Sequence, residues 1–196
     1  MSNIRINSLN NANIYLNGNN MMGRASEVTL PEIKQKMKEL EALGLYGSME
    51  FPVGLEKLES KIKWNSYYSE VMANAGNPLA SHRIQVRSSL EERTSNGMMA
   101  QRPVVCEMSG TFSNLPLGSF KKGDPIDQDT TIAISAIKLS IDGAVILDID
   151  IPANVYKVNG VDILAKFKQN LGLGQGVSRG DIPVSSDLGD AGLIIM

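Results

Sequence analysis

The chain has few of the residues that enzyme and metal sites most often require. Cys106 is the only cysteine and His82 the only histidine among 196 residues. A single cysteine cannot form an internal disulfide, and a single histidine leaves few ligands for zinc or other transition metals. Cys106 lies in the apolar stretch RPVVCEMSG, and His82 stands near the start of a predicted strand. We expect Cys106 to be a buried structural thiol, His82 to be an ordinary polar residue, and the chain to hold no metal or cofactor.

The chain also lacks long hydrophobic runs and an excess of either charge. Hydrophobic residues make up 42% and charged residues 20% of the sequence, and the apolar runs are far shorter than the roughly 20 residues of a membrane helix. The net charge is −2 with dispersed lysines, which gives no basic patch for nucleic-acid binding. The first twenty residues contain eight asparagines and no apolar region of a signal peptide. These features predict a single-domain protein that is made in the cytosol and stays there.

What the chain does have is alternating apolar residues between turn-forming dipeptides. This pattern predicts a mainly β fold, a barrel or sandwich with one or two short helices and extended arms. Asn17-Gly18 ends the first predicted strand in a hairpin turn. A polar tip over 91–101 separates two strands in the middle of the chain. The predicted strands and extended stretches cover residues 13–18, 25–30, 49–64, 81–90, 102–112 and 130–151.

Two segments before residue 80 have helical patterns. The spacing of Ile33, Met37, Leu40 and Leu43 predicts a helix over 32–43, ended by Gly44, although an extended arm would also tolerate this sequence. The stretch SYYSEVMANAG, residues 66–76, predicts a short helix that ends at its glycine.

The clearest hairpin signal is Asp142-Gly143, which lies between two β-rich runs. A two-residue loop would place Leu139 opposite Ile146 and Ile137 opposite the acidic Asp148. A three-residue loop, 141–143 with Gly143 in the left-handed conformation, would instead pair Leu139 with Val145 and Ile137 with Leu147. We therefore expect the longer loop.

The same hairpin predicts a polar face and an irregularity. Lys138, Asp148 and Asp150 would point away from the apolar face, towards solvent or a neighbouring chain. Ile132 and Ile134 have the opposite parity from the apolar residues that follow them, which indicates a bulge near Ala136.

The last predicted element is a short amphipathic helix. Asn159-Gly160 forms a turn before it, and Asp162 lies in the first turn, where a negative charge suits the helix dipole. Gly172 ends the helix. We expect its apolar face to pack on a sheet, and this face consists of Ile163, Leu164, Phe167 and Leu171.

Four other sequence features invite functional interpretations that their contexts do not favour. GLGQG at 172–176 follows a helix instead of joining a strand to one, so it does not predict a phosphate loop. Arg179-Gly180-Asp181 spells an adhesion tripeptide that is common by chance. Asp148 and Asp150 alternate onto one exposed strand face, as solvated carboxylates do, and do not predict acid-base or calcium chemistry. We expect Trp64, Tyr67 and Tyr68 to be core or interface anchors. No catalytic constellation emerges, and we predict that the chain is not an enzyme.

One block of the sequence resembles a known family. Residues 139–173, LSIDGAVILDIDIPANVYKVNGVDILAKFKQNLGL, are similar to the major tail tube proteins (FII type) of contractile-tailed bacteriophages, which are related to R-type pyocin tube subunits. IYLNG, VTLP and the stretch 43–64 nearer the N-terminus support the resemblance in the same order. Within the block, the family motif places structural weight on Gly143, Asn159, Gly160, Asp162, Phe167 and Leu171.

The resemblance implies a structural protein of the virion, assembled in the bacterial host cytoplasm. It implies hexameric rings that stack into a hollow tube, with four strands per subunit joined into one continuous inner barrel. DNA would pass through the lumen without specific binding, and the tail sheath protein, baseplate initiator and tail terminator would be partners. The domain is expected to span 1–171, with an N-terminal arm and an arm over 30–51, before a Gly-rich extension at 172–196. Contacts between subunits are expected at Leu30, Pro31, Leu45, Tyr46, Met49 and Phe51.

Three alternatives stay open at this point. The same subunit design would serve a headless, phage-tail-like bacteriocin. A β-sandwich that binds another protein through its Gly-rich tail would instead be a stable monomer. A small hydrolase could use Cys106 or the pair Asp148 and Asp150, but no second histidine is present to act as a base for the cysteine.

Overall fold

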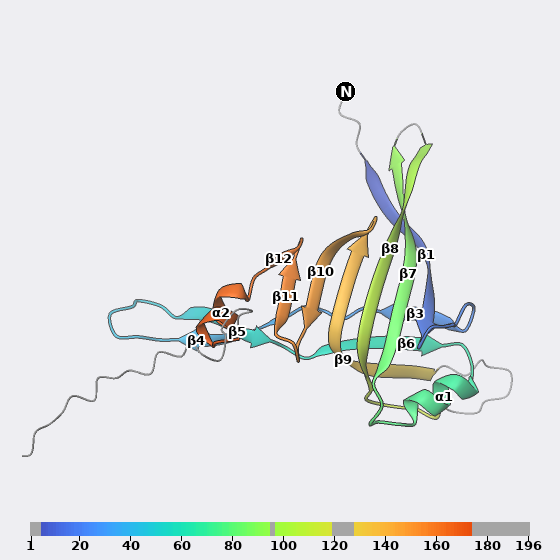
Figure 1. Cartoon of the computed structure of the whole chain (residues 1–196), viewed down its shortest axis with the longest axis horizontal. Coiled ribbons are helices and arrows are strands. Elements are labelled where there is room, and N and C mark those ends of the chain that lie inside the picture. The colour runs from blue at the N-terminus through green and yellow to red at the C-terminus, as the bar shows by residue number, and fades with distance from the viewer. Residues whose placement is uncertain (1–4, 95–96, 119–127, 174–196) are drawn as a thin grey trace, which may run out of the picture.

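The structure is a computed structural model, and it describes residues 5–94, 97–118 and 128–173 (Figure 1). The predicted mainly β fold is confirmed, with antiparallel strands and two short helices in the described ranges. The strands are β1 (Ile6–Leu16), β2 (Asn19–Asn20), β3 (Ala25–Thr29), β4 (Gln35–Leu40), β5 (Met49–Leu55), β6 (Leu58–Trp64), β7 (His82–Thr94), β8 (Gly97–Phe112), β9 (Gln128–Ile141), β10 (Ala144–Asp150), β11 (Val155–Val158) and β12 (Val161–Asp162), and the helices are α1 (Ser69–Ala75) and α2 (Ala165–Asn170).

One large sheet organises the molecule, in the order β12-β11-β10-β9-β8-β7-β1-β2. The first half of β9 also pairs with β6, and β6 pairs with β3, so a second layer branches from this strand (Figure 1). The change of layer coincides with a bulge, because Ser109 pairs with Ala136 while Gly110 pairs with Ile134 and leaves Ser135 unopposed. The bulge predicted near Ala136 is confirmed, and it reverses the parity of the buried residues along β9.

The hydrophobic core draws on the large sheet, the branch and α1. Trp64 is fully buried, and its indole Nε1 donates a hydrogen bond to Thr130 Oγ1 at 2.9 Å. This places Trp64 in the core, as one of the two predicted alternatives for it. The other buried apolar side chains are Ile14, Leu16, Met21, Leu58, Ile62, Val71, Ala75, Ile84, Val86, Cys106, Met108, Phe112, Ile132, Ile134, Ile137 and Ile149.

The helix predicted before residue 80 at 66–76 is confirmed as α1, and Gly76 ends it with a backbone hydrogen bond from its N–H to the Met72 carbonyl. Val71 and Ala75 of α1 are buried. The middle pair of strands is longer than predicted, since β7 runs to Thr94 and β8 starts at Gly97, within the segment expected to be a polar tip.

The helix predicted over 32–43 is wrong. These residues form β4, which pairs with β5 as a separate two-stranded hairpin that projects from the body of the fold (Figure 1). Leu40 lies opposite Met49 and Lys38 opposite Phe51. The apolar spacing satisfied a helical period by coincidence, and cross-strand pairing with residues 49–55 decided the conformation.

The three-residue loop predicted in the β9–β10 hairpin is also wrong. Asp142 and Gly143 have φ values of 53° and 78°, which is the pair of positive angles that a two-residue type I′ turn requires. The ladder begins with Ala144 opposite Ile141 and shifts by one residue after Val145, so that Leu147 faces Leu139 and Ile149 faces Ile137. A bulge, not a longer loop, brings the apolar faces into agreement.

Gly110 is the residue that lets β8 approach β9 at the bulge. A Cβ atom at this position would lie 2.1 Å from the backbone oxygen of Ala133. We predict that Gly110→Ala lowers the free energy of unfolding by about 3 kcal/mol, the upper part of the range for overpacked sites, because the neighbour is backbone and cannot rotate away.

Urea unfolding followed by circular dichroism measures this effect. Gly47→Ala is the matched control, since nothing lies within 4 Å of a Cβ at Gly47, and it should change the free energy by less than about 0.5 kcal/mol. Equal stability of the two variants would show that β8 and β9 are not in this register.

Candidate functional site

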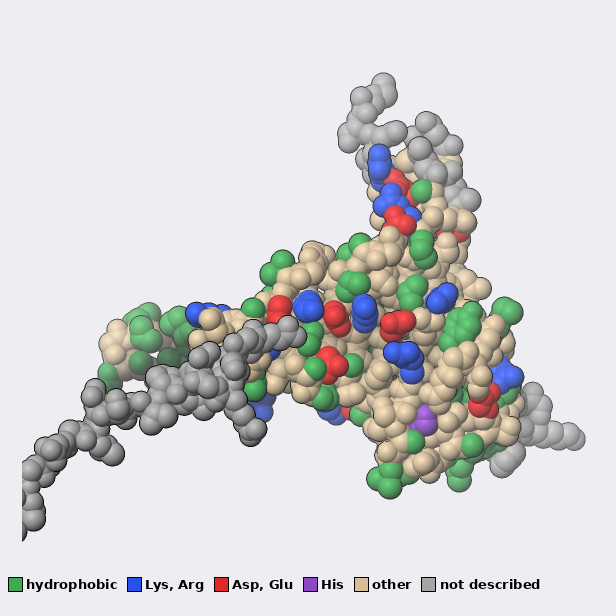
Figure 2. Space-filling view, in the orientation of Figure 1, with side chains coloured by type: hydrophobic (Ala, Val, Ile, Leu, Met, Phe, Trp, Pro, Cys, Tyr) green, Lys and Arg blue, Asp and Glu red, His purple; other side chains and the backbone are tan. Residues whose placement is uncertain are grey.

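A row of alternating charges crosses the large sheet at right angles to its strands. Glu107 on β8 lies opposite Lys138 on β9, and Lys138 lies opposite Asp148 on β10. Asp148 in turn faces Lys157 on β11, and Lys157 faces Asp162 on β12. We call these five residues the charge row. Figure 2 shows the red and blue side chains alternating along one line across this face of the molecule.

The row continues through hydrogen bonds onto the strands at the other end of the sheet. Gln85 on β7 lies opposite Glu107, and its Nε2 donates to Glu107 Oε1 at 2.7 Å. Arg87 Nε donates to Gln85 Oε1 at 2.8 Å, and the Arg87 guanidinium lies 5.6 Å from the centre of the Tyr15 ring on β1. One polar line therefore connects seven strands of the large sheet: β1, β7, β8, β9, β10, β11 and β12.

On β8, β9 and β10 the opposite face is apolar, and Cys106, Met108, Ile137 and Ile149 are buried there. Cys106, next to Glu107, is 2% exposed, and burial together with the neighbouring carboxylate raises the pKa of its thiol to about 11. The thiol is therefore protonated at neutral pH, which agrees with the predicted structural role. Because successive side chains of a strand point to opposite faces, the charge row lies on the face of the sheet that points away from the core.

Asp162 forms the end of the row and also fixes the start of α2. Its Oδ1 accepts a hydrogen bond from the Leu164 N–H at 2.9 Å, and its Oδ2 pairs with Lys168 Nζ. The hydrogen bond from Lys168 and the one from the Leu164 backbone lower the pKa of Asp162. Asp162 was expected in the first turn of the helix, but it precedes α2, which starts at Ala165.

The prediction that α2 packs its apolar face on a sheet is wrong for the isolated chain. Phe167 is 53% exposed, Ile163 and Leu171 are similarly exposed, and α2 contains no buried residue. The end of the helix is as predicted: Gly172 has φ 70°, its N–H bonds to the Gln169 carbonyl, and the Leu173 N–H bonds to the Lys168 carbonyl. The turn at Asn159-Gly160 is also confirmed, with φ values of 49° and 81°.

The β4–β5 hairpin is the second candidate surface, and it exposes most of its large apolar side chains. Leu40, Met49 and Phe51 share one face of the hairpin, and each is more than 40% exposed. Apart from the half-buried Leu55, every residue of the two strands is exposed. The hairpin thus contributes an apolar face that has no partner among the residues the structure describes.

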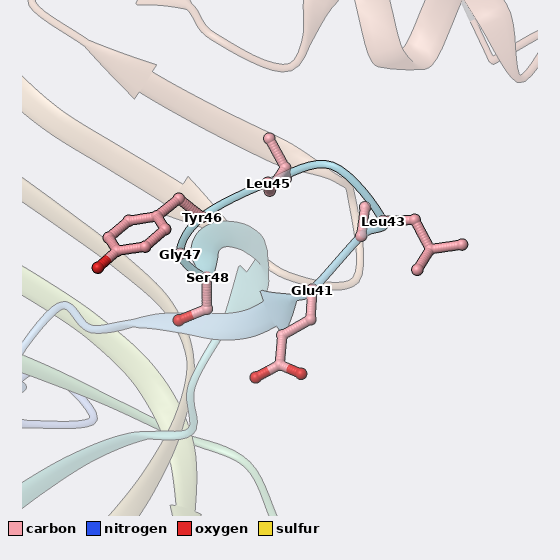
Figure 3. A pocket seen from close by; sticks show the side chains of 7 residues that line it. Glu41, Leu43, Leu45, Tyr46, Gly47 and Ser48 are labelled. Carbon is pink, nitrogen blue, oxygen red and sulfur yellow. The ribbon is translucent and has the colours of Figure 1, made fainter.

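The tip of the hairpin is more exposed still. Leu43 and Tyr46 are fully exposed, and their side chains point away from each other on the two sides of the loop (Figure 3). A hollow of about 430 Å³ lies between the tip residues, from Glu41 to Ser48. Among the residues predicted as contacts, the hairpin brings together Leu45, Tyr46, Met49 and Phe51.

The remaining predicted residues lie elsewhere. The exposed Leu30 and half-buried Pro31 follow β3 on the way to the hairpin. His82 is buried at the start of β7, with Nδ1 3.1 Å from Asn17 Nδ2 and its ring against Phe112. Asp148 and Asp150 are half-buried on the outward face. Residues 174–196, with the adhesion tripeptide and most of the GLGQG stretch, lie outside the described residues.

Comparison with known proteins agrees with this architecture. The family model for phage tail tube protein FII matches residues 6–172. The chain belongs to this tail tube family. It is 28% identical over 167 residues to the tail tube protein of Escherichia phage P2, covering 82% of this chain and 94% of the relative. It is 24% identical over 164 residues to the major tail tube protein of Serratia phage KSP20, covering 82% and 93%.

A solved structure has the same fold. It is the sheath/tube terminator of an extracellular contractile injection system, PVC, solved in the extended state by cryo-EM. The TM-score is 0.50 at 11% identity, over 66% of this chain and 92% of that one. The tail tube family identifies this chain as a virion structural protein. No helix in the described ranges is long and apolar enough to cross a membrane.

A charge reversal at the centre of the charge row tests whether the row stabilises the sheet. Lys138→Glu would place three carboxylates side by side on β8, β9 and β10. We predict a loss of about 1 to 2 kcal/mol in the free energy of unfolding, from two directly opposed like-charge pairs, and a smaller loss at high salt.

Chemical unfolding at low and high salt measures this. Lys61→Glu is the matched control, because Lys61 is an exposed mid-strand lysine that lies between Thr29 and Thr131 and should tolerate the change. If Lys138→Glu and the control lose the same free energy of unfolding at every salt concentration, the alternating charges of the row do not stabilise the sheet.

Asp162 predicts a pH dependence of α2. Its pKa is lower in the folded chain than in the unfolded chain, so the ionised form stabilises α2 above the ordinary aspartate pKa of about 3.9, and the stabilisation is lost as pH falls through the folded pKa. Asp162→Asn keeps an acceptor for the Leu164 N–H and removes the charge.

Amide hydrogen exchange of Lys168 and Leu171, compared between wild type and variant at each pH, measures this contribution. Exchange in Asp162→Asn should be faster than in wild type at pH 7, and the two should converge as the pH falls through the lowered pKa of Asp162. A difference that is independent of pH would assign the effect to the hydrogen bond alone.

Proposed function

We propose that the chain polymerises, as stacked hexameric rings, into the inner tube of a contractile phage tail, where it is a conduit for DNA and a rod for sheath contraction. The observation that carries this proposal is the β4–β5 hairpin. A two-stranded hairpin is marginally stable alone in water, and this one exposes apolar side chains on its face and tip. Because the chain belongs to a tail tube family, we take a second copy of the chain as the partner of this hairpin.

The charge row supports the position of the large sheet in such a tube. The branch of β3 and β6 forms a second layer from one side of β9, and the row lies on the face opposite the buried core. When copies join side by side in a ring, the bulky second layer has room only on the outside. The face that carries the charge row, which points away from the core, would then line the channel of the tube.

The row gives this channel a surface suited to a passing polyanion. It has three carboxylates and two ammonium groups, a net charge of −1, in strict alternation. Fields of alternating charges cancel over distances comparable to their spacing, and tight phosphate binding requires clustered cations. DNA would therefore slide along the row without adsorbing to it.

The role that we propose is structural and not catalytic. The tail sheath protein, the baseplate initiator and the tail terminator would contact the assembled tube, and assembly would take place in the bacterial host cytoplasm. The tube of a headless, phage-tail-like particle would use the same surfaces.

Negative-stain electron microscopy over a concentration series tests the proposal. Wild type should form hollow tubes or six-fold rings. The double variant Leu43→Asp, Tyr46→Asp should stay monomeric with an unchanged circular dichroism spectrum, because both side chains are fully exposed in the isolated chain.

Leu79→Asp is the matched control. Leu79 is almost fully exposed but lies between α1 and β7, away from the hairpin, so this variant should assemble like wild type. Wild type that stays monodisperse at every concentration would count against the tube, and tubes formed by the double variant would remove the hairpin from the interface.

A further inference from the structure

A groove lies between the open edges of two strands, β1 and β3. The chain leaves β1 through β2, turns at Met21 to Arg24, and enters β3, which pairs with β6 instead of returning along β1. The two strands therefore diverge and leave hollows of about 510 and 120 Å³ that share the lining residues 11–13. Ile14 and Met21 are buried beside the smaller hollow, and Val28 is half-buried there. The edges of β1 and β3 that border these hollows are candidate acceptors for one more strand.

Asparagine side chains accept hydrogen bonds from backbone N–H groups along the open edge of β1. The Ile14 carbonyl accepts a hydrogen bond from the Met21 N–H on the open side, so the backbone groups of alternate residues, Ile14 and Ala12, face that side. Asn11 Oδ1 accepts the Ala12 N–H at 2.8 Å, and Asn13 Oδ1 accepts the Ile14 N–H at 3.0 Å. These amide oxygens satisfy the edge in the isolated chain and can be displaced by the carbonyl groups of an incoming strand.

The chain itself contains a segment with suitable chemistry beyond its family domain. The tail tube match ends at residue 172, while the sequence continues to Met196. Its last six residues, Ala191-Gly-Leu-Ile-Ile-Met, are apolar and include two β-branched residues, which favour a strand. Asp187 and Asp190 precede them, and Arg87 lines the larger hollow of the groove. The β-forming residues suit pairing with an open strand edge, and the two carboxylates complement the charge of Arg87.

We propose that residues 191–196 of one copy add as a β-strand to the groove between β1 and β3 of another copy. The added strand displaces the Asn11 and Asn13 side chains from the edge of β1 and covers the side chains of Met22 and Ala25. The intervening residues 174–190 span at most about 55 to 60 Å when extended, which sets the largest distance between the donor helix α2 and the acceptor groove. The inference rests on the proposed self-assembly and adds a second contact, made by a segment outside the family match.

Disulfide trapping between two differently labelled full-length chains tests this contact. One chain carries Ala12→Cys, at the edge of β1, and the other carries a single cysteine at one of positions 192–195. Directly opposite residues of neighbouring antiparallel strands have Cα atoms about 4.5 to 5.5 Å apart, within the range that a disulfide spans. The native Cys106 is 2% exposed with a raised pKa, so it stays unreactive in mild oxidant.

The expected result is a mixed dimer on a non-reducing gel for at least one tail position, at least tenfold more abundant than with the control acceptor Leu79→Cys. Adding Ile194→Asp and Ile195→Asp to a donor labelled at 192 or 193 should abolish it. Equal, weak trapping with Ala12→Cys and Leu79→Cys in samples that form tubes would overturn the inference and leave the proposed function standing.

Electron microscopy of the same samples separates the two proposals. Trapping without tubes would support the groove contact and count against the tube. Absence of both would overturn both.

Discussion

The fold depends on one strand that belongs to two layers. β9 pairs with β8 along most of its length, with β6 in its first half and with β10 in its second half. This sharing requires the bulge at Ser135, where the buried side of the strand changes, and it requires Gly110, because the Ala133 carbonyl occupies the space of a side chain there. Without this shared strand, the large sheet would have no second layer, and the charge row would not lie on a face opposite a core.

Local patterns predicted the parts of the fold that local sequence controls. The Asn-Gly turns at 17–18 and 159–160, the bulge near Ala136 and helix α1 follow from residue chemistry within a few positions, and all were found. The predictions failed where pairing partners decide. Helical spacing over 32–43 gave way to a β-hairpin, and the apolar faces of β9 and β10 were aligned by a bulge that alternation alone does not reveal.

The candidate surfaces show the same limit. Lys138, Asp148 and Asp162 were each noticed from sequence, but their common line depends on the registers of strands β8 to β12, since a slip of one residue at any pair would break the alternation. The contacts predicted at Leu45, Tyr46, Met49 and Phe51 came from resemblance, and the structure groups them on one hairpin. Leu43 was assigned to a helix because its spacing fits a helical period, and Arg87 was not considered because it belongs to no recognisable motif.

In the proposed tube, the β4–β5 hairpin, which has no partner among the described residues, would affect the kinetics of growth. A free subunit gains little from holding two isolated strands in order, so the conformational entropy of the hairpin is lost when the subunit docks. In the proposed tube, the first few subunits would lose this entropy with few contacts in return, while a subunit that joins an existing ring would meet a complete receiving surface. Spontaneous nucleation would then be slow compared with elongation, and the place where a filament starts would be set by whatever template first offers that surface.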